Sequence, residues 1–527
     1  MSDHSSLMVE KLWRLKRRID KGQCPGVDFV HLNVLLREPA YRADVLRRVA
    51  SSGSPELQAL AREIIANDPG TPLVSKSPVE TLTKPEKPVR TRSRLSKNLV
   101  VVLPAMGALV AAIAGFTAFE NRAVRVSGDI VSNTVWESGR RYILEDIIYV
   151  DNAQLTIQPG VTVEGERGSA LVVTRNSKLF ARGTQEQPVV FTSHQPAGER
   201  ARGDWGGVVL LGNAPVNQPE AAIEGVPESD SRGQFGGTDS RHSCGVVQYT
   251  RIEFAGFEVY KNNELNGLTL GGCGSDTIVQ HAQVHRALDD GIEMFGGTVD
   301  LKNIIVTGAA DDSIDWDWDW GWTGNVQFAV IQQYGDVGDN GFEGDNNGSD
   351  HNALPRSEPA FYNVTMYGSG RSAKQHRGIL LREGSGGHFH NMIVDSYALE
   401  PIDTRDEVTS LAAMGKLTFS HNLISNDGHL GNQSAAVEAE DDDFGFREDE
   451  WLKDPRNSNH SLLDSALHPS TKSPTAPYFL SRGQIRDKAA KRPPKSEFFD
   501  ESADYLGAIN PRVSNTWLES WTAFPES

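Results

Sequence analysis

The sequence predicts an all-β ectodomain wound as a parallel β-helix, with a small α-helical N-terminal domain and one transmembrane helix before it. Three observations lead to this fold class. An uncharged run of 21 residues divides the chain, short β-rich runs recur at a nearly regular spacing after it, and one acidic motif returns three times within those runs. At 527 residues the chain is also long enough for more than one folding unit.

The first 67 residues carry apolar side chains at helical spacing, and Ser54-Pro55-Glu56 is typical of a helix start with proline at its first position. Residues 1–67 therefore predict a small helical domain. Residues 68–98 are rich in Pro, Ser, Thr and Lys, which predicts a linker. Neither part shows a catalytic pattern, so a docking module for a cytoplasmic partner and a helical tail without a partner both fit.

The run LVVVLPAMGALVAAIAGFTAF, residues 99–119, has the length that a helix needs to cross about 30 Å of hydrocarbon. The basic segment KPEKPVRTRSRLSKN precedes it and Glu120 follows. The positive-inside rule then predicts a signal anchor of a bacterial inner membrane, with the N-terminus cytoplasmic and the remainder periplasmic or extracellular. A buried helix of a soluble domain is the alternative, and the basic flank disfavours it.

The charge of the chain is unevenly spread. Residues 1–98 hold 18 Lys and Arg against 11 Asp and Glu, so the net charge of −18 leaves −25 on the part that follows residue 119. Such an acidic body disfavours nucleic acid as a partner, because that binding rests on cationic contacts with phosphates. It favours cations, or simply solubility.

Residues 120–450 read as a solenoid. Runs that end in a β-branched pair, such as VVQYTRIEFAG and IVQHAQVHRA, alternate with runs that follow Gly or Ser, such as GLTLGG and GIEMFGG. Members of the second class begin at spacings of 24, 22, 28 and 37 residues, at Gly267, Gly291, Ser313, Gly341 and Gly378. Two strands per unit without a leucine-rich consensus predict a parallel β-helix, in which each unit is one coil. Residues 451–527 are expected to pack on or cap it.

The segments LTIQPGVTVEG, GSALVVTRNSKLFARGTQEQPVVFTS, VHRALDDGIEMFGGTVDLK, FFDESADYLGAI and WLESWTAF carry a family resemblance. The chain resembles the right-handed parallel β-helix (pectin-lyase-like) superfamily from about Tyr142 onward, and most closely a group of bacterial cell-surface β-helix proteins whose activity is unassigned. The resemblance implies a coiled ectodomain. It implies little about a reaction.

The acidic motif reads ALDDGIEMFGG at 287–297, AADDSIDWDWD at 309–319 and VGDNGFEGDNN at 337–347. Stacking the coils predicts an apolar core column of Leu268, Ile292, Ile314, Phe342 and Ile379. The next position should face outward, and it holds Thr269, Glu293, Asp315, Glu343 and Leu380. Since stacked strands are about 4.8 Å apart, eight carboxylates crowd together: Asp289, Asp290, Glu293, Asp311, Asp312, Asp315, Asp339 and Glu343.

Neighbouring charges at that spacing repel by about 1 kcal/mol in water and about 3 to 4 kcal/mol at an effective dielectric of 20. Calcium is the simplest compensation, because it takes six to eight hard oxygen ligands with tolerant geometry. Shared protons and nearby arginines are alternatives. The turn aspartates Asp289, Asp311 and Asp339 also fit a plain role in bonding their own backbone, which leaves the strand carboxylates unexplained.

The run WDWDWGW at 316–322 places Trp316 in the core if Ile314 points inward. Trp320 and Trp322 lie beside glycines and are expected at a turn. Together with Asp317 and Asp319 they are candidate glycan-binding residues, because sugar rings match an apolar face and a polar rim.

The superfamily includes calcium-dependent pectate lyases and polygalacturonases with clustered aspartates, so the resemblance raises a polysaccharide lyase or hydrolase. Candidate catalytic residues are Asp290, Asp312, Arg377 and Arg382. Inverting hydrolysis needs two carboxyl groups about 6.5 to 9.5 Å apart, which adjacent coils offer. A regular ladder is nevertheless unlike one asymmetric site, and the balance leans against catalysis.

Cys244 and Cys273 precede strands of the first class on successive coils. Stacking brings their Cα atoms toward disulfide range, and pairing and free thiols both remain open. The leading function is a membrane-anchored, calcium-stabilised β-helix that binds envelope glycan or another surface partner. A carbohydrate-active enzyme and a structural assembly subunit are the alternatives.

Overall fold

The computed structural model describes residues 11–12, 15, 39–51, 55–68, 123–218, 221–226, 230–260, 263–316, 321–368, 377–397, 399–425, 446–462, 490–513 and 516–527. The chain divides into two compact units. The first is Met1–Ile113 with Tyr260–Asn262, and the second is Ala114–Val259 with Asn263–Ser527.

In the described part of the first unit, helix α3 (Pro39–Ala50) packs against helix α4 (Pro55–Asn67). The proline predicted at the first helical position does begin α4. Apolar side chains fill the contact between the helices, and Arg42 is buried there because its guanidinium forms two hydrogen bonds with the carboxylate of Asp68. This part is a helical hairpin, as the spacing of its apolar residues indicates.

Within the described part of the chain, no helix is both long and apolar enough to cross a membrane. The predicted span at 99–119 and nearly all of the predicted linker lie outside the described residues.

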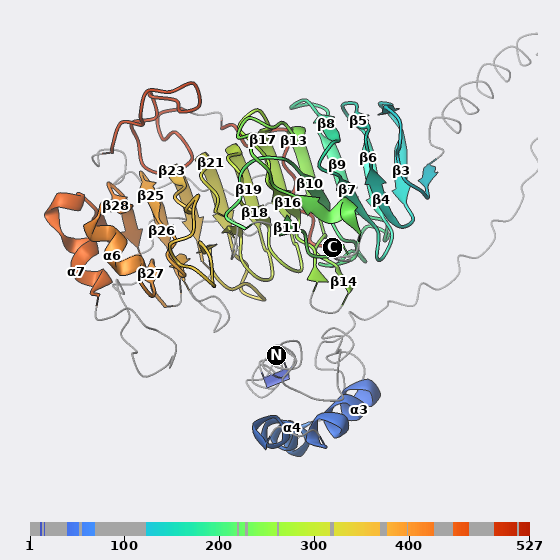
Figure 1. Ribbon diagram of the computed structural model, residues 1–527, viewed down its shortest axis with the longest axis horizontal. Coiled ribbons are helices and arrows are strands. Elements are labelled where there is room, and N and C mark those ends of the chain that lie inside the picture. The colour runs from blue at the N-terminus through green and yellow to red at the C-terminus, as the bar shows by residue number, and fades with distance from the viewer. Residues whose placement is uncertain are drawn as a thin grey trace, which may run out of the picture. The chain divides into compact units, whose positions relative to one another are not determined.

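The second unit is a parallel β-helix whose coils follow one another along its length (Figure 1). One face is a nine-stranded parallel sheet that takes one strand from each coil. In chain order its strands are β4 (Ile147–Val150), β7 (Ala170–Val173), β10 (Val208–Leu211), β16 (Leu268–Gly271), β18 (Ile292–Phe295), β20 (Ile314–Trp316), β22 (Phe342–Gly344), β24 (Ile379–Leu381) and β27 (Asp403–Thr404).

The other two faces form a single seventeen-stranded sheet, because long strands such as β13 pair with β8 through their first half and with β9 through their second. Its early strands are β1 (Val124–Val126), β2 (Thr134–Trp136), β3 (Arg141–Leu144), β5 (Gln154–Ile157), β6 (Thr162–Gly165), β8 (Lys178–Arg182) and β9 (Val189–Ser193). Its later strands are β13 (Gly245–Glu253), β17 (Ile278–His285), β19 (Asp300–Thr307), β21 (Asn325–Gln332), β23 (Ala360–Tyr367), β25 (Gly387–His390), β26 (Ile393–Asp395), β28 (Leu417–Ser420), β29 (Leu423–Ser425) and β30 (His460–Leu462).

A left-handed residue bends each long strand at the boundary between these two faces. The positions stack from coil to coil, and the ladder pairing skips them. They are Tyr249, His281, Asn303, Phe328 and Asn363, with φ between 46° and 64°. Because only one residue leaves the extended region, the chain turns a corner without a loop.

The interior is a continuous stack of apolar side chains, as the repeats indicate. Leu268 pairs in register with Ile292, Ile292 with Ile314, Ile314 with Phe342, and Phe342 with Ile379. All five are fully buried in the core. The predicted core column is therefore present residue for residue.

Smaller elements cover parts of the coils. The hairpin β11 (Ala221–Ala222) and β12 (Gln234–Phe235), with the 3₁₀ turn η1 (Ser231–Gly233), packs its apolar residues on the outer face of the early nine-stranded sheet. The strands β14 (Glu258–Tyr260) and β15 (Asn263–Glu264) form a second pair.

At the other end stand α6 (Val408–Ala413), α7 (Glu448–Lys453) and η2 (Pro455–Asn457) (Figure 1). Strand β30 then pairs with β29. The solenoid thus continues past the expected boundary at residue 450, because a chain segment beyond α7 still adds a strand to the sheet.

Residues 490–513 and 516–527 lie on the outside of the seventeen-stranded sheet and run back along it toward the early coils (Figure 1, red). Their backbone is held by polar side chains of successive strands: Asn391 bonds Lys491, Asn363 bonds Ala503, and Gln283 bonds Ala523. The expected packing of this segment on the β-helix takes the form of a strap.

Candidate functional site

The acidic motifs align on three neighbouring strands of the nine-stranded sheet. Glu293 pairs in register with Asp315, and Asp315 with Glu343. Thr269 precedes this row and Leu380 follows it. We call the eight aligned carboxylates the acid column: Asp289, Asp290, Glu293, Asp311, Asp312, Asp315, Asp339 and Glu343.

The column points away from the core, but it is not the open surface that alternation along the strands predicts. Glu293 and Asp315 are only 4% and 7% exposed, and Asp290 and Asp312 are equally buried. Part of the cover is visible beside Glu293, where the amide of Asn266 contacts both this carboxylate and Glu224, which follows β11. The predicted outward direction of this position is therefore confirmed, but Glu293 and Asp315 are covered because segments between strands fold back over this sheet face.

The turn aspartates link successive coils through the backbone. The side-chain oxygen of Asn266 accepts the N–H of Asp290 at 3.2 Å, and Asp290 Oδ1 accepts the N–H of Asp312 at 2.8 Å. Asp312 Oδ1 in turn accepts the N–H of Asn340. Part of their role is thus the plain backbone bonding that turn aspartates favour.

A second regularity joins each turn residue to the outward strand residue of the next coil. Asn266 meets Glu293 at one end of the row. Two contacts between carboxyl groups follow, Asp290 with Asp315 and Asp312 with Glu343. The first of these contacts joins an amide to a carboxylate. The next two join one carboxyl group to another, and each of them requires a shared proton or a cation.

Burial and mutual repulsion both act on these groups. Burial, and after it the charge of Asp311, raises the pKa of Asp290 well above that of an ordinary aspartate. Burial, and then the charges of Glu343 and Asp290, raises the pKa of Asp312 in the same direction. Burial also raises the pKa of Glu343, although Arg382 opposes the shift. The middle of the column therefore resists carrying its full negative charge.

The two candidate catalytic arginines are both engaged in ion pairs. Arg377 is buried against Glu400 and Asp403, with Nε 3.1 Å and 2.6 Å from their carboxylate oxygens. Arg382 contacts Glu343 and lies 2.7 Å from Asp345. Both guanidinium groups thus neutralise carboxylates. Arg377, which precedes Gly378, also repeats the contact of a turn residue with the outward strand residue of the next coil, with a cation in place of an acid.

Two overlapping groups within the column have the geometry of a metal site. The carboxylates of Asp289, Asp290 and Asp311 offer oxygens within 4.8 Å of one another, and so do those of Asp290, Glu293 and Asp315. Asp290 belongs to both groups. All donors are oxygens, which suits a hard cation such as calcium.

Near the acid column, the side-chain oxygens of two amides, Asn340 and Gln333, accept no hydrogen bond from the described residues. Asn340 gives its amide N–H to Glu343 at 2.9 Å, and Gln333 gives its own to the carbonyls of Asp339 and Asn340. Turning either amide over would set oxygen against oxygen. Among the described residues, Asn340 Oδ1 and Gln333 Oε1 are consequently buried acceptors without a hydrogen-bond donor, on the coil that follows the two carboxylate groups.

Trp322, the aromatic glycan-binding candidate that the structure describes, is not open to a ligand. Trp322 is fully buried in the core, and its indole N–H donates to the carbonyl of Val299 at 3.0 Å. The expectation that it is exposed at a turn is wrong, because Gly321, at φ +71°, turns the chain back inward there. Trp316 lies in the core as expected, whereas Trp320, Asp317 and Asp319 fall outside the described residues.

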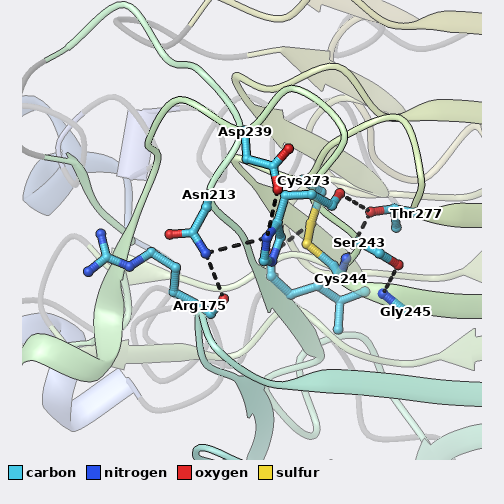
Figure 2. The surroundings of a disulfide bond; sticks show 10 residues. Arg175, Asn213, Asp239, Ser243, Cys244, Gly245, Cys273 and Thr277 are labelled. Atoms are coloured by element: carbon cyan, nitrogen blue, oxygen red, sulfur yellow. Dashed lines mark hydrogen bonds and ion pairs between the residues drawn. A yellow bond between two sulfur atoms is a disulfide. The ribbon is translucent and has the colours of Figure 1, made fainter.

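Cys244 and Cys273 form a disulfide between successive coils (Figure 2). Their Cα atoms are 5.7 Å apart and both side chains are fully buried. The N–H of Cys244 donates to the hydroxyl of Thr277 at 2.9 Å, which fixes the start of β13 beside the bridge.

Sequence reasoning missed the uncharged members of the site. Asn266 precedes Gly267 as Asp290 precedes Gly291, so the repeat itself could have identified it. Gln333 follows β21 on another face, and only the winding of the coil brings it to Asn340.

Comparison with known proteins supports the fold and not a reaction. No curated protein and no solved structure matches the chain significantly. The family described as the pectate-lyase-like beta helix domain matches residues 128–450, which is more than half of the chain. A β-helix domain of this kind indicates, in general terms, a role at a surface or with carbohydrate. From this match and from the stacked parallel strands, the chain belongs to the pectate-lyase-like β-helix family.

Proposed function

We propose that this protein is a membrane-anchored periplasmic or cell-surface β-helix that binds calcium in the acid column and an acidic glycan over it. The observation that carries the proposal is the position of Asp290, whose carboxylate belongs to two groups of three with oxygens within 4.8 Å. Calcium accepts that donor set, and its six to eight positions exceed what three carboxylates fill.

The half-buried carboxylates of Asp289 and Asp311 bring one of the two groups to the edge of the site. An ion held there keeps coordination positions open on the solvent side. Carboxylate and hydroxyl oxygens of a sugar acid would complete them, which makes an acidic polysaccharide the partner of matching chemistry.

The membrane part of the proposal rests on the uncharged run at 99–119 and its basic flank. Ala111→Arg, near the middle of that run, is expected to weaken insertion, since a central arginine costs about 2.5 to 3.5 kcal/mol. Fractionation of cells that express the full chain measures this directly. Protein that remains soluble without the substitution would contradict the anchor.

The glycan part is tested by binding of the full chain to a panel of acidic and neutral polysaccharides, with calcium or with chelator. We expect calcium-dependent binding to acidic members, and its loss in Asp289→Asn with Asp311→Asn. Glu358→Gln, a carboxylate beside His388 on the other sheet, is the matched control. Equal binding of both variants would contradict the assignment.

The same assay separates the catalytic alternative, which the raised pKa values of Asp290 and Asp312 favour because general acids need them. Release of reducing ends, or of unsaturated products that absorb ultraviolet light, would show that the protein cleaves the polysaccharide and would support the catalytic alternative. Stable binding without product supports the non-catalytic function.

A further inference from the structure

The last part of the strap, residues 516–527, is held on the sheet by side chains that grip its backbone; we call these residues the terminal strap. Gln283 exchanges two hydrogen bonds with Ala523, and Arg251 donates to the carbonyl of Trp521 at 3.1 Å. His285 bonds the carbonyl of Pro525 at 2.8 Å. Three polar side chains of β13 and β17 thus replace a paired strand.

Both ring nitrogens of His285 have a hydrogen-bond partner, and burial keeps the ring neutral. Nε2 must carry the proton, because the carbonyl of Pro525 only accepts. Nδ1 is then the acceptor, and the hydroxyl of Thr307 lies 2.7 Å from it. A second proton on Nδ1 would require that hydroxyl to turn and accept instead, and it would leave a charged ring in a buried site.

The charges that surround His285 also disfavour protonation. Three guanidinium groups act on the ring, those of Arg202, Arg251 and Arg286. The other titratable groups of the packed elements are Glu253, paired with Arg251; Asp336, paired with Arg202; the phenol of Tyr334; and Glu526 of the strap, which acts on Arg286.

His281 also lies on β17, on the N-terminal side of His285, and aromatic rings enclose it. It stacks on Tyr249 with ring centroids 4.3 Å apart, and the edges of Trp517 and Trp521 close it from the strap side. Its Nδ1 is buried without a hydrogen-bond partner. The phenol of Tyr249 is the titratable group of this enclosure, so nothing in it would balance a charged imidazole.

We propose that His281 and His285 form an acid-sensitive latch: protonation of the two rings releases the terminal strap and uncovers the sheet face beneath it. That face is apolar, since Ile305 and Val330 pack against Leu518, Trp521 and Phe524 of the strap. Release would thus present an aromatic and aliphatic surface that is covered at neutral pH.

The direction follows from linkage. Burial lowers the pKa of His285 to about 3 and that of His281 to about 4, below the ordinary 6.5 that exposure restores. The open state therefore binds more protons between these values, and opening becomes more favourable as the pH falls below 6.5. At pH 5 the opening constant rises by up to about 30-fold for each histidine, and up to about 1,000-fold for both.

Hydrogen exchange of the backbone in residues 516–527 tests the latch, with rates corrected for the intrinsic effect of pH. The full chain should lose protection there by two to three orders of magnitude, on the order of the linkage figure, between pH 7.5 and pH 5. Residues 503–508 are the internal reference, because Asn363 and Thr365 hold them without a histidine.

His281→Phe with His285→Gln keeps the ring stack and an amide donor but removes both titrating groups. We expect its strap to stay protected at pH 5, and His281→Phe alone to retain about a 30-fold response. His388→Gln, whose ring contacts Glu358 and Thr418 on the same sheet, is the matched control and should behave as the unaltered chain.

Should the double variant fail to fold, the single variant decides, because its response must be intermediate. Strap protection that does not change between pH 7.5 and pH 5, or that falls equally in the histidine variants and the unaltered chain, would overturn the latch.

Discussion

The acid column, which stacks from coil to coil, and the two histidines of β17 beneath the terminal strap are both groups of largely buried titratable side chains, yet they treat charge in opposite ways. In the column, acid meets acid between Asp290 and Asp315, and burial with repulsion raises the pKa values. Under the strap, His285 lies among three guanidinium groups, and burial lowers its pKa. One site favours an added cation, and the other excludes any further positive charge.

The difference shows what a coil does to a repeated residue. Stacking multiplies whatever occupies a position, so a repeated carboxylate needs compensation from outside the repeat. At its far end the column receives that compensation from Arg382, which contacts Glu343. One coil further on, Arg377 is a built-in cation at the turn position and meets Asp403. In the middle the compensation must come from protons or from an ion.

The largest effect is expected where the built-in cation is removed. Arg377→Gln should destabilise the protein by about 3 to 5 kcal/mol, because it removes the buried guanidinium that pairs with both Glu400 and Asp403, and Arg405 remains only beside Asp403. Urea unfolding measures it. Arg456→Gln, in an exposed pair with Asp454, is the control and should leave the unfolding midpoint nearly unchanged, because solvent screens that pair.

The pH dependence of stability in chelator should show both sites at once. The lowered pKa values of His281 and His285 mean that stability falls as the pH drops below 6.5, by up to about 2 kcal/mol for each ring at pH 5. The raised pKa values of Asp290 and Asp312 mean that stability also falls as the pH rises through that raised range.

Thermal melts from pH 4.5 to pH 8.5 follow both limbs. The histidine double variant should lose only the acidic limb, and Asp290→Asn with Asp312→Asn only the alkaline one. If all variants showed the same pH dependence of melting temperature, the acidic and alkaline losses of stability would not arise from these two sites.

A smaller effect with a change of sign is expected for Asp290→Asn alone. The asparagine keeps an oxygen for the N–H of Asp312 but removes a buried charge. In chelator at pH 8 it should raise the melting temperature, because it removes a carboxylate whose charge burial and the neighbouring Asp311 disfavour. In calcium it should destabilise the protein, since a ligand is lost.

Asp300→Asn is the matched control for that reversal, because Asp300 is a partly buried aspartate on β19 that bonds Asn325. Its effect should be the same with and without calcium. Melting temperatures in the two buffers are sufficient. The same sign for Asp290→Asn in both would argue for shared protons and against an ion.

The smallest effect concerns the strap. Gln283→Ala removes two hydrogen bonds to Ala523 and should cost about 1 to 3 kcal/mol, since it also leaves buried backbone groups unpaired. It should raise exchange in residues 516–527 at every pH and leave the pH response itself intact. Loss of the pH response in this variant would place the sensor outside the histidines.

Much of the fold could be predicted from the sequence, because the register is encoded locally. Ile292, Ile314 and Phe342 each follow Gly or Ser and precede an acid, and counting from that signal gives the observed pairing. What covers the column could not be predicted in this way. Glu224 reaches the column from a hairpin between two strands, and no period marks that insertion.

The strap is the clearest case beyond the reach of local patterns. Gln283 and Ala523 are 240 residues apart in sequence, so their contact depends on the complete winding of the coils. The prediction for Trp322 was wrong for a more local reason. Its neighbouring glycine indicated a turn correctly, but that turn leads into the core.

The most direct test of the central claim is calcium titration of the full chain after chelation, at pH 7.5, followed by calorimetry and elemental analysis. We expect stoichiometric uptake of calcium, which Asp290→Asn with Asp315→Asn abolishes and Glu358→Gln leaves unchanged. We also expect the melting temperature to rise with calcium. The free energy of unfolding should increase by about 4 kcal/mol at a calcium concentration 1,000 times the dissociation constant. No uptake, with identical melting in calcium and in chelator, would contradict it.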